Sequence, residues 1–237
     1  MRAHLLFIDT EASGWPKNWD APYSKRNNWP YCVQISWIIY NNAGEEIKAE
    51  DHYINDDFKI ENASYKIHGI DHAYLAAHGE QRTAVMTRLA NDITQYQPML
   101  VGHFMELDMH MISADFYRAK MPNPTIGLPT FCTMKNTEDS ALMPGRKYLR
   151  LNELYSILFD KAQPGQHNAM SDARAAAECF FELVKRGKIN DRLIDERQEA
   201  VADIPERKKI MPYLIFSTAL SVIAIIILIV YLLWMHS

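Results

Sequence analysis

The sequence predicts an α/β domain followed by one transmembrane helix, and three observations support this prediction. An uninterrupted apolar run at residues 5–8 is typical of a strand that is buried on both faces. Apolar residues at helical spacing then alternate with short strand-like runs. Residues 210–235 contain no charged side chain, and at about 1.5 Å per helical residue they can cross a hydrocarbon core of about 30 Å.

Three strands are predicted at the start of the chain. The apolar run (LLFI) forms the first. Residues 31–40 (YCVQISWIIY) are rich in β-branched and aromatic side chains, turn-forming residues follow at 41–44, and extended character resumes over 46–54. The second and third strands are therefore expected to form a hairpin.

Helices and short strands alternate in the remainder of the domain. Residues 80–96 have apolar side chains at helical spacing, and Pro98 ends this helix before a short strand at 99–101. A mixed sheet covered by helices is the expected result. The same reasoning predicts helices over 104–119, 151–159 and 171–186, and a strand over 130–133.

The chain is expected to have three parts. Residues 1–187 fit one domain with a sizeable core, residues 188–209 form a charged, partly helical linker, and residues 210–235 form the transmembrane helix. Basic residues at 207–209 place the domain on the cytoplasmic side of a single-pass, tail-anchored protein, with the lipid bilayer as one partner. A buried core helix is the alternative for the apolar segment.

Composition excludes some classes of protein. The chain has 25 Lys and Arg against 29 Asp and Glu, so it lacks the basic surface that grips duplex nucleic acid by charge alone. Its three cysteines are far apart and form no CxxC pair, which argues against a disulfide framework and a zinc ribbon.

Two carboxylates directly follow the first strand. Asp9 and Glu11 are two residues apart, a spacing that directs both side chains to one face of a strand. Two such charges are costly to hold together unless a cation neutralises them. The pair therefore suggests a divalent metal site, with chance occurrence of Asp-x-Glu as the alternative.

Two further segments carry acidic residues near helix starts. Asp108 follows the predicted strand at 99–101, and Asp172 lies in the first turn of the last long helix, five residues after His167. Carboxylates after parallel strands meet at the carboxyl edge of an α/β sheet, where ligands bind. Taken singly, an aspartate early in a helix is most often a helix cap or a partner of the helix dipole, and a histidine such as His167 is more often a surface loop residue.

The order of these motifs resembles that of the DEDDh exonuclease family, which includes the proofreading subunit of bacterial replicative polymerase, ribonuclease T and oligoribonuclease. The segment 66–70 (KIHGI) is similar to the family's HGI segment, and the resemblance covers about residues 4–187. It implies a ribonuclease H-like mixed five-stranded sheet flanked by helices. It also implies 3′-to-5′ polarity and release of nucleoside 5′-monophosphates.

The resemblance assigns roles residue by residue. Asp9, Glu11, Asp108 and Asp172 would be metal ligands, and His167 would be the general base. Four hard carboxylate ligands favour two Mg²⁺ or Mn²⁺ ions over zinc. Two cations can stabilise charge on both the attacking and the leaving oxygen, and a histidine base is worth roughly 10² to 10⁴ in rate.

Two positions depart from the family pattern. Phe104 stands where Asn is usual, and Ala12 stands where Thr is frequent. Ala12 is nevertheless expected to meet the terminal nucleotide through its backbone. His103 is a further candidate substrate contact, with orientation of the turn before Asp108 as the alternative role.

The segment 14–31 interleaves aromatic and basic residues. Aromatic rings can stack on bases while neighbouring cations meet phosphates, as single-stranded nucleic acid requires. The favoured contacts are Trp15, Lys17 and Arg26. The alternative is a rigid loop whose tryptophans simply pack onto the domain. The three prolines of the segment support this alternative, so the two interpretations have equal weight.

The predicted function is therefore metal-dependent 3′-to-5′ exonuclease activity on single-stranded 3′ ends, with DNA favoured. One alternative is an oligoribonuclease-like enzyme acting on short RNA. The other is a membrane-anchored nucleic-acid-binding or scaffold protein without catalysis, although all five motif residues are present. A polymerase partner, the pathway and the membrane are not predicted.

Overall fold

The computed structural model describes residues 2–138 and 147–201. Six strands form one mixed sheet in the order β3-β2-β1-β4-β5-β6. β1 pairs in parallel with β4, and β4 with β5, whereas β2, β3 and β6 run antiparallel to their neighbours. The strands are β1 (His4–Ala12), β2 (Cys32–Asn41), β3 (Glu46–Tyr53), β4 (Met99–Gly102), β5 (Pro129–Cys132) and β6 (Glu199–Ala200).

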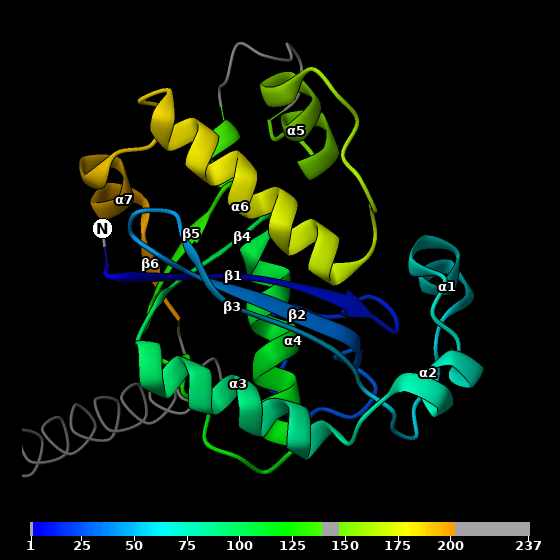
Figure 1. Cartoon of the computed structure of the whole chain (residues 1–237). Helices are drawn as coiled ribbons and strands as arrows, with labels where there is room; N and C mark the ends of the chain where they lie inside the picture. The colour runs from blue at the N-terminus through cyan, green and yellow to red at the C-terminus, as the bar shows by residue number, and fades with distance from the viewer. Residues whose placement is uncertain (1, 139–146, 202–237) are drawn as a thin grey trace, which may run out of the picture. The chain divides into compact units, whose positions relative to one another are not determined.

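Helices cover both faces of this sheet (Figure 1). On one face α3 (Arg82–Tyr96) and α4 (Met105–Arg118) pack against Leu6 and Ile8. On the other face α5 (Leu151–Phe159) and α6 (Ala169–Lys185) pack against Leu5 and Phe7. Because alternate side chains of β1 enter opposite cores, the strand needs apolar residues at every position, which explains its uninterrupted apolar run.

The predicted elements are found with small changes at their ends. The hairpin joins β2 and β3, and the predicted helices correspond to α3, α4, α5 and α6. Two short helices are additional, α1 (Asn62–His68) and α2 (His72–His78). α1 buries none of its residues, so it has no apolar periodicity from which a helix could be predicted. A single turn of 3₁₀ helix, η1 (Lys135–Thr137), is also additional.

The sheet has six strands instead of the five expected. The sixth, β6, pairs with β5 and follows α7 (Asp191–Arg197), both within the segment predicted to be a linker from residue 188. The compact unit extends to Val201. Burial of Ile189, Ile194 and Val201 holds this segment on the domain, because each side chain removes apolar area from water.

The part of the chain that the structure describes contains no helix long and apolar enough to cross a membrane. The predicted transmembrane helix at 210–235 and the end of the predicted linker lie outside the described residues.

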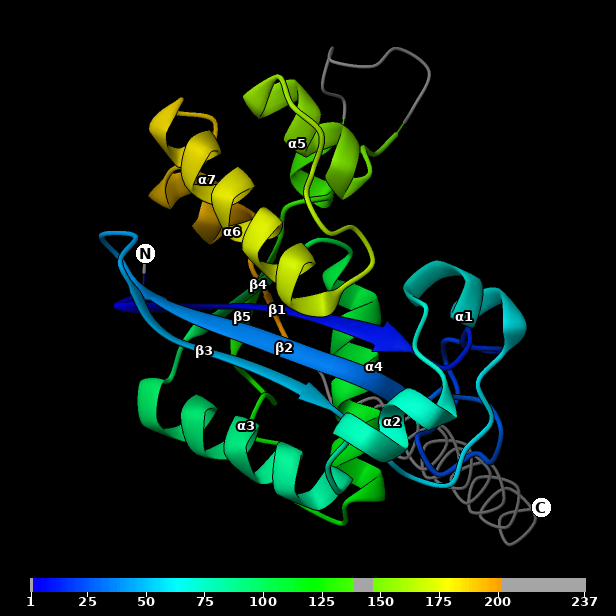
Figure 2. The same cartoon turned by 45° about the vertical axis from the view of Figure 1, so that its right-hand side comes forward.

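The carboxyl ends of the parallel strands lie at one edge of the sheet. β1 points toward α1 and α2 at this edge in both cartoon views (Figures 1 and 2). The end of β1, the first turn of α4 after β4 and the start of α6 carry the predicted metal ligands.

Candidate active site

The alternation of β1 divides its last residues between two faces. Asp9 and Glu11 continue the row of Leu5 and Phe7, so they face α6. Thr10 points the other way, and its Oγ1 donates a hydrogen bond of 2.8 Å to Oδ1 of Asp108. One strand end therefore presents two carboxylates and orients a third.

Asp108 is buried in the first turn of α4. The turn that delivers it begins at Gly102, where a Cβ atom would lie 3.1 Å from the carbonyl oxygen of Ile8 and 2.8 Å from the sulfur of Met105. Only glycine permits this close approach of β4 to β1 without movement of the neighbours. The approach brings the start of α4 against the end of β1.

Asp172 lies in the first turn of α6. The helix begins at Ala169, where Asn168 caps it by accepting a hydrogen bond from the Ser171 amide. Asp172 in turn accepts from the Gln163 side chain and, at 3.1 Å, from the backbone amide of His167. These bonds fold the loop before α6 back onto the carboxylate, so the His167 side chain is both exposed and close to it.

The acidic residues converge with His167. One ligand atom each from Glu11, His167 and Asp172 lie within 4.8 Å of one another. Burial, and then Asp108, Asp172 and Glu11, raise the pKa of Asp9 well above its usual range. Asp108, Asp172 and Glu11 belong to three different motifs, which lie about 60 to 160 residues apart in the sequence.

The other carboxyl groups are perturbed in the same direction. Burial, followed by Asp172 and Asp108, raises the pKa of Glu11 to about 8. Burial raises the pKa of Asp108 to about 8, against the opposing effect of its hydrogen bond from Thr10. Burial also raises the pKa of Asp172. Four carboxyl groups whose ionisation is opposed in this way form a site that a bound cation would stabilise.

This donor set fits hard divalent cations. The convergent ligands are carboxylate oxygens with a single imidazole beside them, and the three cysteines lie elsewhere, in the core or on β5. Oxygen ligands suit Mg²⁺ and Mn²⁺, whereas thiolates would be expected of a structural zinc site.

His103 is held by the protein on both ring nitrogens. Its Nδ1 lies 3.0 Å from Oγ1 of Thr133 and its Nε2 lies 3.0 Å from the carbonyl oxygen of Leu149. Burial lowers its pKa to about 4, which favours the neutral ring. His103 thus joins the β4–α4 turn to the loops after β5 and before α5.

One hollow adjoins Asp172, and a second begins next to the end of β1. The smaller, of about 340 Å³, is lined by His103, Phe104, Tyr148, His167 and Asp172 among others. The larger is a groove of about 910 Å³ that begins at Ser13, directly after β1. Its walls come from the loop between β1 and β2 and from the residues that lead into α1 and α2.

The predicted substrate contacts are distributed unequally around these hollows. Trp15 and Lys17 line the larger groove. Ala12 ends β1 beside it, with the ring of His68 against its backbone. Arg26 is exposed on the same loop and lines neither of the two hollows.

Sequence reasoning missed three residues that orient the site. Thr10 holds Asp108, Gln163 holds Asp172, and Gln34 accepts a hydrogen bond of 3.2 Å from the amide of Ala169 at the start of α6. The alternation of β1 could have identified Thr10, since it lies between two carboxylates and points to the opposite face. The two glutamines carry no comparable signal.

A family model described as exonuclease, RNase_T, matches residues 6–180. No curated protein sequence matches.

Solved structures with the same fold include several of exonuclease I. One exonuclease I structure has 20% identity and a TM-score of 0.65, covering 82% of this chain and 43% of its own. The zinc-bound complex of Escherichia coli exonuclease I with single-stranded DNA has 18% identity and a TM-score of 0.63, covering 78% and 41%. A complex of the E. coli enzyme with a dT13 oligonucleotide has 19% identity and a TM-score of 0.64, covering 82% and 43%. The chain thus spans less than half the length of these proteins, and the likeness establishes a shared fold.

Proposed function

Since this chain belongs to the exonuclease family, with a ribonuclease H-like α/β fold, we propose that it is a metal-dependent exonuclease that degrades single-stranded DNA from the 3′ end. It releases nucleoside 5′-monophosphates by hydrolysis. The family match confirms the prediction of an exonuclease, while the substrate, the polarity and the products belong to the proposal.

The convergence of Asp9, Glu11, Asp108 and Asp172 with His167 is the observation that supports this function best. These residues come from three separated motifs, and the fold brings them to the carboxyl edge of the sheet. A protein that only binds nucleic acid has no need of four carboxyl groups in mutual repulsion, because they would repel the phosphates of its ligand.

The four carboxylates would hold two Mg²⁺ or Mn²⁺ ions. When bound, such ions polarise the phosphate and stabilise charge on the attacking and leaving oxygens. The E. coli exonuclease I complex that contains zinc shows that zinc also belongs among the ions to be tested.

His167 supplies the proton transfer. Its ring is exposed and within reach of the carboxylates, so it can accept a proton from the water that attacks phosphorus. The new bond joins the water oxygen to phosphorus, and the bond to the 3′ oxygen of the preceding nucleotide breaks. That oxygen takes up a proton and becomes a 3′ hydroxyl, and the terminal nucleotide leaves as a 5′-monophosphate.

Single-stranded DNA is favoured as the substrate for two reasons. The groove beside the site is lined by the exposed residues Trp15 and Tyr65, whose rings offer flat apolar surfaces on which unpaired bases stack. The similar E. coli enzyme has been crystallised with single-stranded oligonucleotides.

Nucleotide release from matched DNA and RNA oligomers tests this function. The full chain in detergent would be incubated with single strands labelled at the 3′ or the 5′ end, in Mg²⁺, Mn²⁺, Zn²⁺ or EDTA. Metal-dependent release of the 3′ label as a 5′-monophosphate, faster from DNA, is expected. Faster release from short RNA would favour the oligoribonuclease-like alternative, and binding without release would favour the scaffold alternative.

We also propose that residues 210–235 anchor this domain to a membrane, with the domain on the cytoplasmic side. The uncharged segment and the neighbouring Arg207, Lys208 and Lys209 support the proposal. Resistance to alkaline carbonate extraction, lost when residues 210–237 are deleted, is the expected result. Extraction of the full chain with peripheral proteins would contradict it.

A further inference from the structure

Gln34 is a fully buried residue of β2 whose side-chain amide has a partner for every hydrogen-bonding group. Its Nε2 donates to Oδ1 of Asp51 at 2.8 Å and to the hydroxyl oxygen of Tyr53 at 3.2 Å. Its Oε1 accepts from the backbone amide of Ala169 at 3.2 Å and from Nδ2 of Asn168 at 3.4 Å. A side-chain amide has two donor hydrogens and two acceptor positions, so all four are used.

The partners of this amide fix its orientation. The carboxylate of Asp51 can only accept and the backbone amide of Ala169 can only donate, so Nε2 faces β3 and Oε1 faces α6. Gln34 also lies opposite Glu11 in the pairing of β1 with β2. One buried side chain therefore joins the edge strand β3 to the start of α6, beside a predicted metal ligand. A buried polar network that is satisfied in this way rigidifies its surroundings.

His167 directly precedes the two residues that Gln34 holds. Its backbone φ is 64°, in the left-handed region, which a residue with a side chain keeps only where its surroundings hold it. On one side, Oδ2 of Asp172 accepts from the His167 amide at 3.1 Å. On the other side, Asn168 and Ala169 are bonded to Gln34. The exposed ring of His167 is therefore placed through the backbone around it.

The hydroxyl group of Tyr53 extends this network to another helix. Besides the bond from Gln34, it has hydrogen bonds with the side chains of Tyr74 and Asn168. Burial, and then the hydrogen bond with Tyr74, raise the pKa of Tyr53. The rings of Tyr53 and Tyr74 meet edge to face with 4.9 Å between centroids. Because Tyr74 belongs to α2, one hydroxyl group joins α2 to the N-cap of α6.

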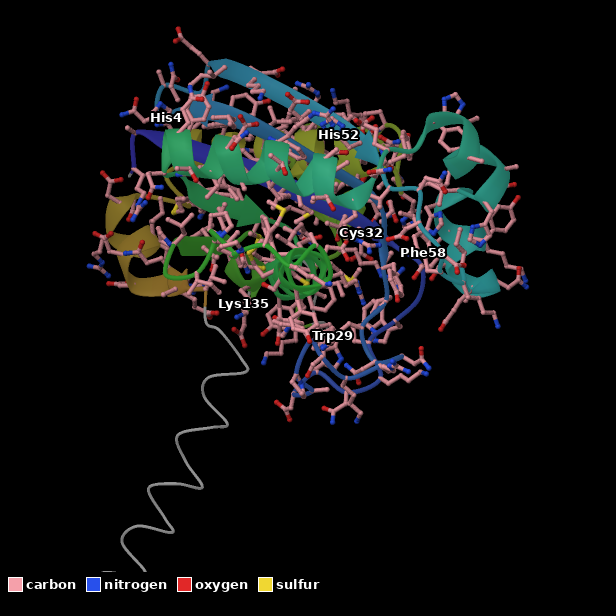
Figure 3. All side chains as sticks on the ribbon, turned by 90° about the horizontal axis from the view of Figure 1, so that it is seen from below. His4, Trp29, Cys32, His52, Phe58 and Lys135 are labelled. Atoms are coloured by element: carbon pink, nitrogen blue, oxygen red, sulfur yellow. The ribbon has the colours of Figure 1, made fainter. Side chains whose placement is uncertain are left out.

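Helix α2 begins at the wall of the larger groove. Asp71 and His72 line this groove, and Oδ1 of Asp71 caps the helix by accepting from the amide of Tyr74 at 2.7 Å. Leu75 of the same helix is buried in a small core cluster with Phe58. In Figure 3, Phe58 lies between the sheet and the two short helices. The turn of α2 that lines the groove is therefore also the turn that reaches Tyr53.

We propose that Gln34 and Tyr53 are positioning residues that link α2 to His167 and so set the placement of the general base. This inference rests on the exonuclease function proposed above. Tyr74 holds the Tyr53 hydroxyl, Tyr53 holds the Gln34 amide, and that amide holds the first residues of α6. Both positioning residues act through His167. Their loss therefore lowers kcat and leaves the affinities for metal and for DNA unchanged.

The test uses the full chain in detergent and two variants of the link. Gln34→Met keeps an unbranched side chain of similar length and removes the amide. Tyr74→Phe keeps the ring and removes only the hydroxyl of a residue that is 39% exposed, so this variant should fold even if Gln34→Met does not. Melting temperatures show which variants are folded.

Two matched controls lie on α4, outside the link. Ser113→Ala removes a buried hydroxyl that accepts a hydrogen bond of 3.0 Å from Asn123 in the loop after α4. Tyr117→Phe removes the hydroxyl of an exposed tyrosine. Both controls should release the 3′ nucleotide with the wild-type kcat.

Nucleotide release in Mg²⁺ measures the effect on turnover. Gln34→Met should lower kcat about 10- to 100-fold, since a small misplacement of a catalytic group is costly. Tyr74→Phe should lower kcat about three- to tenfold, as expected for the loss of one hydrogen bond. In both variants KM and the affinity for Mn²⁺ should stay within about twofold of wild type, because the substrate and metal contacts are intact.

A double-mutant cycle with His167→Ala shows whether these losses act through the base. When His167 is already replaced, Gln34→Met and Tyr74→Phe should cause no further loss of kcat. Losses of the same size with and without the His167 side chain would overturn the proposal, because Gln34 and Tyr74 would then act independently of the base.

The NMR signal of the His167 ring gives a readout that needs no hydrolysis. With ¹³C-labelled histidine in EDTA, this signal is identified by its absence from the spectrum of His167→Ala. Gln34→Met and Tyr74→Phe should each shift it, whereas the two α4 controls should leave it in place. An unmoved signal in the folded Gln34 and Tyr74 variants would overturn the link. Absence of nucleotide release by wild type would overturn the exonuclease proposal, and the NMR comparison would still judge the link.

Discussion

Thr10 and Asp108 are 98 residues apart in sequence, yet Oγ1 of Thr10 donates a 2.8 Å hydrogen bond to Oδ1 of Asp108 in the interior of the domain. Thr10 lies between Asp9 and Glu11 and points to the opposite face of β1. The strand that presents two carboxylates to α6 therefore also orients the carboxylate delivered by α4. This bond favours the ionised form of Asp108, which is the form that binds a cation.

The first prediction concerns this bond. Thr10→Val keeps the shape of the side chain and removes the donor, so Asp108 should ionise at higher pH and bind metal less well. Loss of a partner that orients a ligand typically weakens metal binding by about 10- to 100-fold. Isothermal titration with Mn²⁺ would measure the change.

Thr87→Val is the matched control, because Thr87 is exposed on α3 and its hydroxyl donates to the carbonyl oxygen of Thr83 in that helix and to the sulfur of Met121. It should bind Mn²⁺ like wild type. Equal affinities in Thr10→Val and Thr87→Val would show that Thr10 does not orient a metal ligand.

The second prediction concerns stability and pH. Asp9, Glu11 and Asp108 have pKa values above their usual range, and those of Glu11 and Asp108 lie at about 8. The unfolded chain releases these protons near pH 4. The contribution of these groups to stability is therefore fully present below about pH 4 and is lost as pH rises toward 8.

Melting curves in EDTA should accordingly show the loss of this stability between about pH 5 and 8. Added Mg²⁺ or Mn²⁺ should restore stability most near pH 8. The Asp9→Asn variant should show a smaller loss, since one of the repelling charges is absent. A melting temperature in EDTA that rises over this interval as much in wild type as in the variant would contradict the account.

The third prediction concerns His167. Its alanine variant should lose about 10² to 10⁴ in kcat while Mn²⁺ affinity stays within a few-fold, because a general base contributes to rate and not to metal binding. Comparable loss of rate and affinity would instead make His167 a metal ligand, which its distance from Glu11 and Asp172 permits. His78→Ala, an exposed histidine on α2, should change neither quantity.

The fourth prediction concerns the loop between β1 and β2. Asp115 is completely buried and pairs with Arg118 at 2.6 Å and with Arg82 at 3.3 Å. Arg118→Ala leaves this charge poorly compensated and frees the carbonyl groups of Trp29 and Pro30, so it should cost about 3 kcal/mol of unfolding free energy.

Arg88→Ala removes an exposed ion pair with Glu80 and should cost at most about 1 kcal/mol. Urea unfolding of both variants would measure the difference. A similar small cost for the two arginines would mean that the buried pair does not hold the loop.

Much of the fold could be predicted because the residues that specify it are adjacent in sequence. The uninterrupted apolar run of β1 arises because the strand packs against a core on each face of the sheet. The apolar periodicity of α3 arises because this helix packs against one core only. Helix α1 lacked such a signal because it buries nothing, and β6 lacked one because two residues show no alternation.

For the candidate site, the sequence identified individual residues but not the contacts that they make in the fold. Motif order identified the four carboxylates and His167, whose catalytic roles stay predictions. Spacing alone could not show that both ring nitrogens of His103 are occupied, since Thr133 and Leu149 reach it from other loops. Nor could it show which aromatic residues of the 14–31 segment are buried, because that depends on packing against α4.

The most direct test of the central claim is release of the 3′ nucleotide by wild type and by Asp9→Asn, measured as Mg²⁺ or Mn²⁺ is titrated into the metal-free full chain. Wild type should release 5′-monophosphate in proportion to metal bound. Asp9→Asn should remain folded and release it at least about 10³-fold more slowly at every metal concentration. Wild-type rates in the folded Asp9→Asn variant would contradict the account, because hydrolysis would then not depend on these carboxylates.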